Sequence, residues 1–430
     1  MIQDFYVTNF YSIRERQGIS FVPAKDDSML EHYTYEIKPG KRLLKLGIVY
    51  GSNASGKSIL IQAFEFFREL MIKKPESKSG IMRFEPFMLD MRSRNERSRM
   101  EMSFYVDELR YVLDIEFDKQ RIYKEKLIVY MTPMPSTVYK REYNSEKDVS
   151  DIWFGTKSGL SKKSQAAISG NAINNCSVIA AFGQTNVEKS LLNGIYDFFN
   201  LGMAPMLGPR MRMFDFVKNE LRHQGDDGLK LFLLEMLRAS DFNIVDFRVK
   251  VSEEDMTDDI KRNVMRLPFT EEQRNSILKR GKVMVEDFIF SHTGDGGNYD
   301  LSEDAESNGT KRYLGLSSLL YMLLKGNVFV PIDEIETGIH YELLQYFIKL
   351  FLVNSEGSSQ LLMTTHNLEL LDEEFIRRDT VWFTDKDKLG VTSTKRLSSL
   401  GLHNTMSPYN AYRQGKLVDL PFLGSLLLDF

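Results

Sequence analysis

The residues best suited to chemistry form a glycine-rich run of eight, made of Gly51, Ser52, Asn53, Ala54, Ser55, Gly56, Lys57 and Ser58. The run matches G-x-x-x-x-G-K-[ST], in which the two glycines let backbone N–H groups curl around phosphates. The segment 42–50, which ends in an apolar strand, precedes it, and a helix predicted from Lys57 to about Ile72 follows and adds a favourable dipole. We therefore predict an ATP site, with Lys57 reaching the β- and γ-phosphates and Ser58 offering its hydroxyl to Mg²⁺.

A second group lies far downstream, where an apolar run over 327–332 ends in Asp333 and Glu334. We predict that Asp333 holds Mg²⁺, directly or through water, and that Glu334 polarises the water that attacks ATP. Paired carboxylates after a strand are more often a solvated turn, but the apolar run and the phosphate loop favour a site. Proline removes a ladder donor, so Pro331 predicts a bulge next to Asp333.

Composition is that of an ordinary globular chain, with 430 residues of which 42% are hydrophobic. The 56 basic and 60 acidic residues give a net charge of −4, so no global field favours nucleic acid or an anionic membrane. The single cysteine, Cys176, excludes an internal disulfide and favours the cytoplasm. The N-terminus alternates like a strand, and no apolar run approaches the roughly 20 residues of a membrane span. We expect a cytoplasmic protein with no membrane segment.

The pattern of elements predicts an α/β fold built from both ends of the chain. Alternating segments at 100–106, 111–117 and 121–130 predict an antiparallel meander, and apolar residues recur at helical spacing between 187 and 240. No sustained heptads occur, which excludes long coiled-coil arms. We predict three parts: 1–186, the first part of the core with the phosphate loop and a β-rich lobe; 187–280, a mainly helical insertion; and 281–430, the second part of the core.

Six blocks in a fixed order make the sequence similar to a known family: 5–13, 51–58, 306–312, 333–340, 364–367 and 412–416. Their order resembles the OLD-like, ABC-class ATPases of the AAA group that are found in bacterial defence systems, with a layout like the RloA/AbiL type. The similarity spans nearly the whole chain. It implies an ABC-type P-loop ATPase core of the OLD/RecF/SMC-like kind.

The resemblance also implies roles for further residues. Ser307 and Gly309, opening a helix predicted to run through Leu324, match the ABC signature, which caps the γ-phosphate bound by the opposite protomer. Without the resemblance, Ser307 reads as an ordinary N-cap. His366 matches the switch histidine that senses the γ-phosphate, where a lone histidine is more often structural. Residues 336–340 match the D-loop, and no glutamine stands near 85–87 to serve as a Q-loop residue.

By the same resemblance we expect a homodimer or a higher oligomer that closes on ATP and controls a separately encoded effector during phage infection. A RecF-like DNA repair or recombination ATPase is the first alternative. A scaffold that holds ATP with little turnover is the second.

Two other patterns resemble a nuclease motif and a nucleic-acid-binding segment. Asp385 and Asp387 form a D-x-D like that of a nuclease domain, but only 43 residues follow Asp387, so a surface turn is favoured. The basic stretch 92–99 is interrupted by Glu96 and has no interleaved aromatic residues, which favours a solvated loop over a nucleic-acid contact.

Overall fold

The computed structural model describes residues 1–224, 227–258, 281–403 and 406–419, with positions 261, 262, 265, 271, 278 and 279 between them. The chain folds into two compact units. The first combines Met1–Met211 with Met322–Phe430, and the second is Arg212–Tyr321. The insertion predicted over 187–280 overlaps the second unit only in part, because 187–211 belong to the first unit and the second continues to Tyr321.

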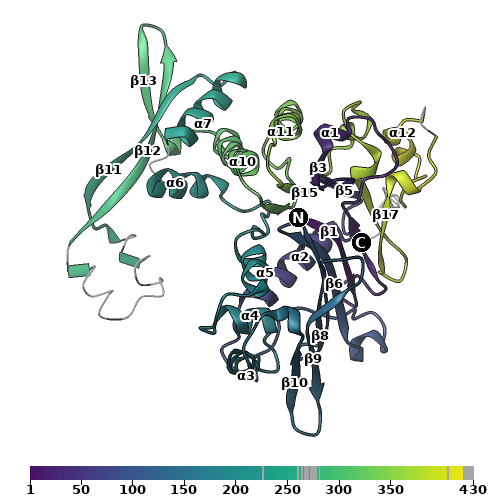
Figure 1. Ribbon diagram of the computed structural model, residues 1–430. Coiled ribbons are helices and arrows are strands. Elements are labelled where there is room, and N and C mark those ends of the chain that lie inside the picture. The colour runs from purple at the N-terminus through teal and green to yellow at the C-terminus, as the bar shows by residue number, and fades with distance from the viewer. Residues whose placement is uncertain are drawn as a thin grey trace, which may run out of the picture. The chain divides into compact units, whose positions relative to one another are not determined.

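A seven-stranded antiparallel sheet in the first unit forms the β-rich lobe (Figure 1). Its strands, in spatial order, are β10 (Val149–Phe154), β9 (Ser136–Asn144), β8 (Ile122–Tyr130), β7 (Leu109–Phe117), β6 (Ser98–Val106), β1 (Ile2–Thr8) and β2 (Gln17–Ser20). Alternate residues of β7 are buried, as expected for a sheet that packs one face on a core. The predicted meander is confirmed, and it continues through β9 and β10.

A five-stranded sheet joins segments from both ends of the chain. Its strands, in spatial order, are β14 (Phe329–Ile332), β15 (Gln360–Thr364), β5 (Leu46–Gly51), β16 (Val381–Lys386) and β17 (Thr392–Arg396). The first four run parallel, and β17 pairs antiparallel with β16. The carboxyl ends of β5, β14 and β15 therefore point the same way, and the predicted α/β core built from both ends of the chain is confirmed.

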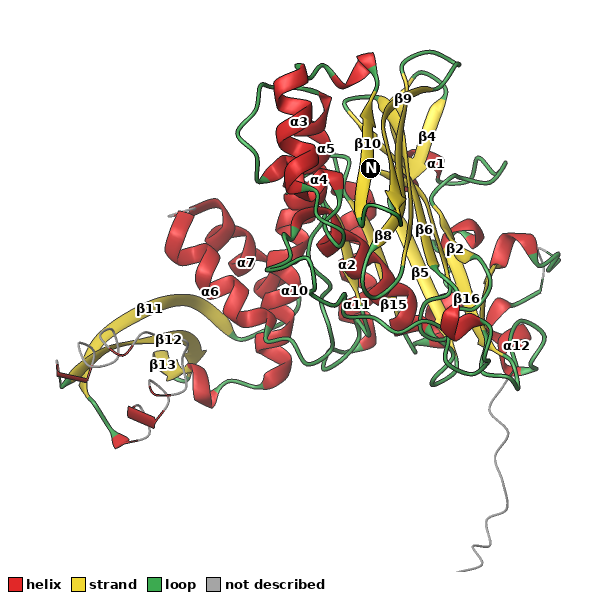
Figure 2. Ribbon diagram, turned by 90° about the horizontal axis from the view of Figure 1, so that it is seen from below, coloured by secondary structure: helices red, strands yellow, loops and turns green. Residues whose placement is uncertain are grey.

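The helix α2 (Lys57–Ile72) links the two sheets through aromatic contacts. The Phe64 ring centroid lies 4.2 Å from Phe5 of β1 and 5.0 Å from Phe329 of β14. Buried aromatic pairs contribute roughly 0.5–1.5 kcal/mol beyond the area they bury, so α2 is fixed on both sides. Helices α3 (Lys162–Asn171), α4 (Val178–Gly183) and α5 (Leu191–Asn200) lie on the same side of the seven-stranded sheet as α2 (Figures 1 and 2).

The remaining elements of the first unit are short or peripheral. They are α1 (Leu30–Tyr33), β3 (Thr34–Lys38), β4 (Lys41–Leu44), α11 (Tyr341–Asn354), α12 (Pro408–Arg413) and the 3-10 turns η1 (Ser93–Asn95), η2 (Thr156–Ser158), η4 (Leu368–Asp372), η5 (Arg378–Thr380) and η6 (Leu397–Ser399).

The strand β14 lies at the edge of its sheet and is covered by the irregular segment 202–207. Phe329 N donates to Gly202 O at 2.8 Å, and Asp333 N donates to Leu207 O at 2.8 Å. The register from Phe329 to Ile332 against β15 is unbroken, so the bulge predicted at Pro331 is wrong. Proline is tolerated here because the strand lies at the edge of the sheet, where the missing N–H costs no bond to β15.

The second unit combines helices with a three-stranded antiparallel sheet. Its elements are α6 (Met213–Gln224), α7 (Asp227–Ala239), β11 (Ile244–Asp255), β12 (Lys282–Gly294), β13 (Gly297–Ser302), η3 (Glu303–Ala305) and α10 (Asn308–Lys325). Phe214 of α6 packs edge-on against Phe288 of β12, with ring centroids 5.0 Å apart. The helix α10 starts in this unit and ends in the first. Among the described residues, no helix is long and apolar enough to span a membrane.

Candidate nucleotide site

The phosphate loop connects a fully buried strand to an open helix end. Every residue of β5 is buried, and α2 begins at Lys57, directly after the loop. Because the N-cap residue is Gly56, no side chain caps the helix, and its first N–H groups are left for another acceptor. Ala54 and Gly56 have φ values of 63° and 108°, which curl the loop. A loop of this shape at a helix N-terminus binds anionic groups such as phosphates.

Both glycines of the loop are required by close packing against β16 and β17. A Cβ on Gly51 would lie 2.4 Å from Thr384 Oγ1, and one on Gly56 would lie 2.4 Å from Thr392 Oγ1. The same threonines hold the loop, because Ser55 Oγ lies 2.6 Å from Thr384 Oγ1 and Thr392 Oγ1 donates to Ser55 O at 2.9 Å. Sequence reasoning missed Thr384 and Thr392, since threonine in a strand gives no signal of its own.

Lys57 lies inside the curl of the loop. Its Nζ donates to Gly51 O at 2.8 Å and to Ser52 O at 3.1 Å. Burial lowers the pKa of Lys57, and the nearby carboxylates Asp333, Glu334 and Glu336 oppose that shift. The lysine and the predicted carboxylates therefore share one electrostatic environment, although about 275 positions separate them along the chain.

The two predicted carboxylate residues follow β14 directly, and one buried hydroxyl group bonds to the side chain of the first and to the backbone of the second. Thr364 Oγ1 donates to Asp333 Oδ1 at 2.5 Å and accepts from Glu334 N at 2.8 Å. Asp333 is only 5% exposed, so its charge needs such a partner. Glu334 has a φ of 50°, which is strained for a residue with a Cβ. The motif 364–367 contained Thr364, but no role was predicted for it.

His366 joins this group from the end of β15. Its Nε2 lies 3.8 Å from Glu334 Oε1, and both side chains are about two-fifths exposed. The structure thus brings together the phosphate loop, Asp333, Glu334 and His366 within the first unit. Ser58 follows Lys57 in the first turn of α2 and is half-buried.

Ser307 and Gly309 lie in the second unit, at the start of α10. Ser307 Oγ accepts from Thr310 N at 3.0 Å, which is the geometry of an N-cap. The preceding Glu306 contacts His292 of β12, with His292 Nε2 2.5 Å from Glu306 Oε1. The predicted helix through Leu324 ends one residue later, at Lys325. Ser307 therefore caps α10 in this structure, and the signature role of Ser307 and Gly309 stays a prediction.

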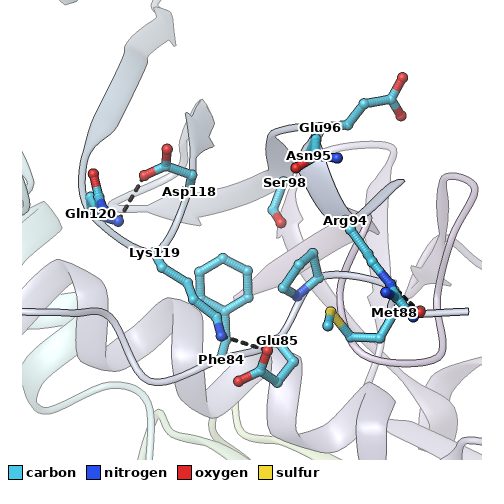
Figure 3. Close-up of a pocket in the computed structure, with 11 residues that line it drawn as sticks. Phe84, Glu85, Met88, Arg94, Asn95, Glu96, Ser98, Asp118, Lys119 and Gln120 are labelled. Atoms are coloured by element: carbon cyan, nitrogen blue, oxygen red, sulfur yellow. Dashed lines mark hydrogen bonds and ion pairs between the residues drawn. The ribbon is translucent and has the colours of Figure 1, made fainter. Parts of the chain in front are cut away.

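A separate shallow cavity of about 380 Å³ lies beside 85–87 (Figure 3). Lys119 pairs with Glu85 at 2.5 Å, and Arg94 donates to Met88 O at 2.6 Å. In the basic stretch 92–99, Arg92 pairs with Glu96, Arg97 with Glu116 and Arg99 with Asp114. These arginines are thus neutralised locally.

The D-x-D pattern starts in β16, where Asp385 pairs with Ser393 of β17, and Asp387 opens the turn between the two strands. Asp387 Oδ1 accepts from Leu389 N at 2.9 Å and from Val391 N at 2.8 Å. Lys395 Nζ donates to Asp385 Oδ2 at 3.4 Å. Both carboxylates therefore have local partners. The predicted surface turn is found at Asp387, whereas Asp385 belongs to the strand.

The residues at the phosphate loop fit ATP with Mg²⁺. No cluster of three or more His, Cys, Asp or Glu side chains among the described residues forms a cage for a metal ion. Mg²⁺ at nucleotide sites needs none, because it takes one or two protein oxygens and completes its shell with phosphate oxygens and water. The hydroxyl of Ser58 and the carboxylate of Asp333 supply oxygens of that kind.

A family model described as "AAA domain, putative AbiEii toxin, Type IV TA system" matches residues 48–372, about three quarters of the 430 residues. The chain belongs to this family. Membership in an AAA family makes the chain a P-loop ATPase, which implies ATP binding and suggests hydrolysis. No curated protein matches the chain.

Two solved structures of SMC heads are similar in fold over 92% of this chain and 98% of theirs. One is the SMC head domain from Thermotoga maritima, at 12% identity and a TM-score of 0.40. The other is an SMC head bound to the C-terminal winged-helix domain of ScpA, at 10% identity and a TM-score of 0.41.

Proposed function

We propose that this chain hydrolyses ATP with Mg²⁺ at the phosphate loop and that the reaction operates a switch in bacterial defence. One observation carries the proposal. The buried Lys57 lies in the phosphate loop after β5, and three carboxylate residues follow β14 in the same sheet, near enough to oppose the lowering of the lysine pKa by burial. A phosphate-binding lysine, an aspartate for Mg²⁺ and a residue that activates water are the parts that recur in phosphoryl transfer to water.

In this mechanism Lys57 and the loop N–H groups hold the β- and γ-phosphates of ATP. Glu334 takes a proton from the attacking water as its oxygen bonds to the γ-phosphorus. The bond from that phosphorus to the bridging oxygen breaks, and ADP leaves with the electron pair. His366, beside Glu334, donates a hydrogen bond to the γ-phosphate. Ser58 and Asp333 would hold Mg²⁺, which would neutralise negative charge on the phosphates.

The site is completed by a second copy of the chain, on this proposal. The open phosphate loop of one protomer receives Ser307 and Gly309 of the partner, at the N-terminus of α10. Two ATP molecules then lie between two protomers. Because the γ-phosphate gives the closed dimer contacts that the open form lacks, ATP shifts the population to the closed dimer and hydrolysis reverses the shift.

The family description, which names a toxin and a toxin–antitoxin system, supports a role in defence. We propose the OLD-like, RloA/AbiL type of arrangement, in which the ATPase controls a separately encoded effector in the cytoplasm during phage infection. Closure of the dimer would be the signal that the effector reads.

The variant Glu334→Gln tests the proposal. The amide keeps the shape of the carboxylate but cannot take the proton, so we expect steady-state phosphate release to fall about a hundredfold or more while ATP still binds. We also expect ATP to drive this variant into stable dimers, as measured by light scattering. A pull-down of the variant with ATP from its own host should enrich one effector over the Lys57→Ala variant.

Three results would contradict parts of the proposal. If Glu334→Gln released phosphate at the rate of the parent, Glu334 would not be the group that activates the water. ATP held intact for hours by the parent would favour a scaffold. Strong stimulation of phosphate release by DNA, without an effector, would favour a RecF-like repair ATPase.

A further inference from the structure

The loop after β14 is joined to the last residue of β15 and to the loop that follows it by three hydrogen bonds. Glu334 N donates to Thr364 Oγ1 at 2.8 Å, and Ile335 N donates to Thr364 O at 3.2 Å. In the reverse direction, His366 N donates to Glu336 Oε1 at 2.6 Å. The third bond is charge-assisted and about twice as strong as a neutral one, and it fixes the backbone that carries the histidine ring.

The carboxylate of Glu336 has a second oxygen that this bond does not use. Glu336 Oε2 is buried and has no hydrogen-bond partner among the described residues. The hydroxyl group of Tyr50 is also fully buried and also has no hydrogen-bond partner among the described residues. A buried polar atom left unpaired costs roughly 1–3 kcal/mol, so two of them in one region call for an explanation.

The two unpaired groups are chemically complementary. The backbone next to Tyr50 contacts the loop that carries His366, because Thr365 N donates to Val49 O at 3.2 Å. Burial raises the pKa of Tyr50, and the nearby Tyr341 and Glu336 act in the same direction. A neutral phenol donates and a carboxylate oxygen accepts. Tyr341 cannot take the place of Tyr50, because its hydroxyl donates to Glu373 Oε1 at 2.7 Å and accepts from Gln345 at 2.8 Å.

We propose that Glu336 is the positioning residue for His366 during ATP hydrolysis, and that the Tyr50 hydroxyl supports it by donating to Glu336 Oε2, directly or through one buried water. The inference rests on the proposed hydrolysis. Tyr50 is the residue before Gly51, so this contact links the phosphate loop to the histidine through one carboxylate. Removing the Glu336 carboxylate frees the backbone of His366. A misplacement of about 1 Å at a reacting group costs about a hundredfold in rate.

The first test compares Glu336→Ala with Glu336→Gln and with a matched control, Glu356→Ala, which removes an exposed glutamate between α11 and β15. Alanine removes the acceptor for His366 N, and we expect kcat to fall about ten- to a hundredfold with the KM for ATP within about threefold. Glutamine keeps an acceptor oxygen, and we expect kcat within about threefold of the parent. Because Glu336 also acts on Lys57, the glutamine variant separates the hydrogen bond from the charge.

The second test is a double-mutant cycle with His366→Ala. A general loss of stability caused by Glu336→Ala would lower kcat equally with and without the histidine, so the cycle distinguishes it from a positioning role. If Glu336 works through His366, then Glu336→Ala should lower kcat by less than about twofold once the histidine is gone. Tyr50→Phe should lower kcat about three- to tenfold in the parent and have little effect added to Glu336→Ala.

The outcomes separate this inference from the proposed function. If the parent and Glu356→Ala release no phosphate, the proposed hydrolysis fails. If they release phosphate and Glu336→Ala matches them, the positioning role fails. Equal losses for Glu336→Gln and Glu336→Ala would assign the effect to charge and overturn the proposal, as would a full loss that persists in the His366→Ala background.

Discussion

One hydroxyl group, that of Thr364, holds both carboxylate residues of the candidate site. It bonds to the Asp333 side chain and to the Glu334 backbone, and Thr364 is fully buried. Without it, a buried carboxylate oxygen and a strained backbone N–H each lose a partner. The site therefore depends on a residue type that sequence reasoning treats as a common strand former.

We predict that Thr364→Val, which keeps the shape but removes the hydroxyl, lowers phosphate release about tenfold or more. Thr364→Ser keeps the hydroxyl and should stay within about threefold of the parent. Release is measured over a range of Mg²⁺ concentrations, and the valine variant should need more Mg²⁺. Equal activity of the two variants would show that the hydroxyl does not hold the carboxylates in the reacting state.

Lys57 gives the second prediction at this scale. Lys57→Ala removes the fixed cation inside the loop, and we expect no measurable ATP binding in a calorimetric titration with Mg²⁺. The control is Lys73→Ala, which removes an exposed lysine just after the same helix and should bind ATP like the parent. Unchanged affinity of Lys57→Ala would mean that the phosphate loop is not the nucleotide site.

At the scale of elements, the phosphate loop depends on the hairpin of β16 and β17. We predict that Gly56→Ala abolishes ATP binding and lowers the melting temperature, because its Cβ would collide with Thr392 at a φ of 108°. The control Gly40→Ala has a φ of 73° with nothing within 4 Å, so it carries conformational strain of about 1 kcal/mol and no collision. Equal effects of the two variants on ATP binding would show that the phosphate loop does not depend on its packing against the hairpin.

The elements around the chemistry could be predicted because their patterns are local. The buried run of β5 followed by Gly51 and α2 defines the phosphate loop, and the apolar run before Asp333 defines β14. The alternating strands likewise predicted the meander. Each of these signals lies within about 15 consecutive residues, which is the range over which periodicity can be read.

What could not be predicted depends on contacts between distant segments. The edge position of β14 explains Pro331, yet strand order follows from packing and not from the strand's own residues. Thr384 and Thr392 meet the phosphate loop across more than 320 positions. Glu336 fell inside a predicted motif, but its bond to His366 N needs both loops in place.

At the scale of the whole molecule, the shared site predicts complementation. Lys57→Ala and Ser307→Arg protomers should each be inactive alone, for different reasons. In a mixed dimer, one of the two sites combines an intact phosphate loop with an intact signature segment. We expect phosphate release to recover to about half of the parental rate at most, if closure does not require both ATP molecules.

The measurement is phosphate release from each variant and from the mixture, with subunit exchange verified separately by a labelled protomer. No recovery despite exchange would contradict a site shared in this way. If Ser307 acts only as an N-cap, mixing the two variants should likewise restore no phosphate release. Mixtures of Lys57→Ala with the parent are the reference for the rate of a dimer with one intact phosphate loop.

The chain passes between its two units twice, at 211–212 and at 321–322, and both passages lead to β14. One runs along α10, which ends four residues before Phe329. The other follows segment 202–207, which is bonded to Phe329 and Asp333 along the outer edge. The segment 202–207 is also bonded to α2, because Arg68 Nε donates to Met203 O at 2.7 Å and Met206 N donates to Glu65 Oε2 at 2.9 Å. The two chain connections that leave the second unit therefore lead to β14, which ends in the two carboxylates, and to α2, which begins with the lysine of the phosphate loop.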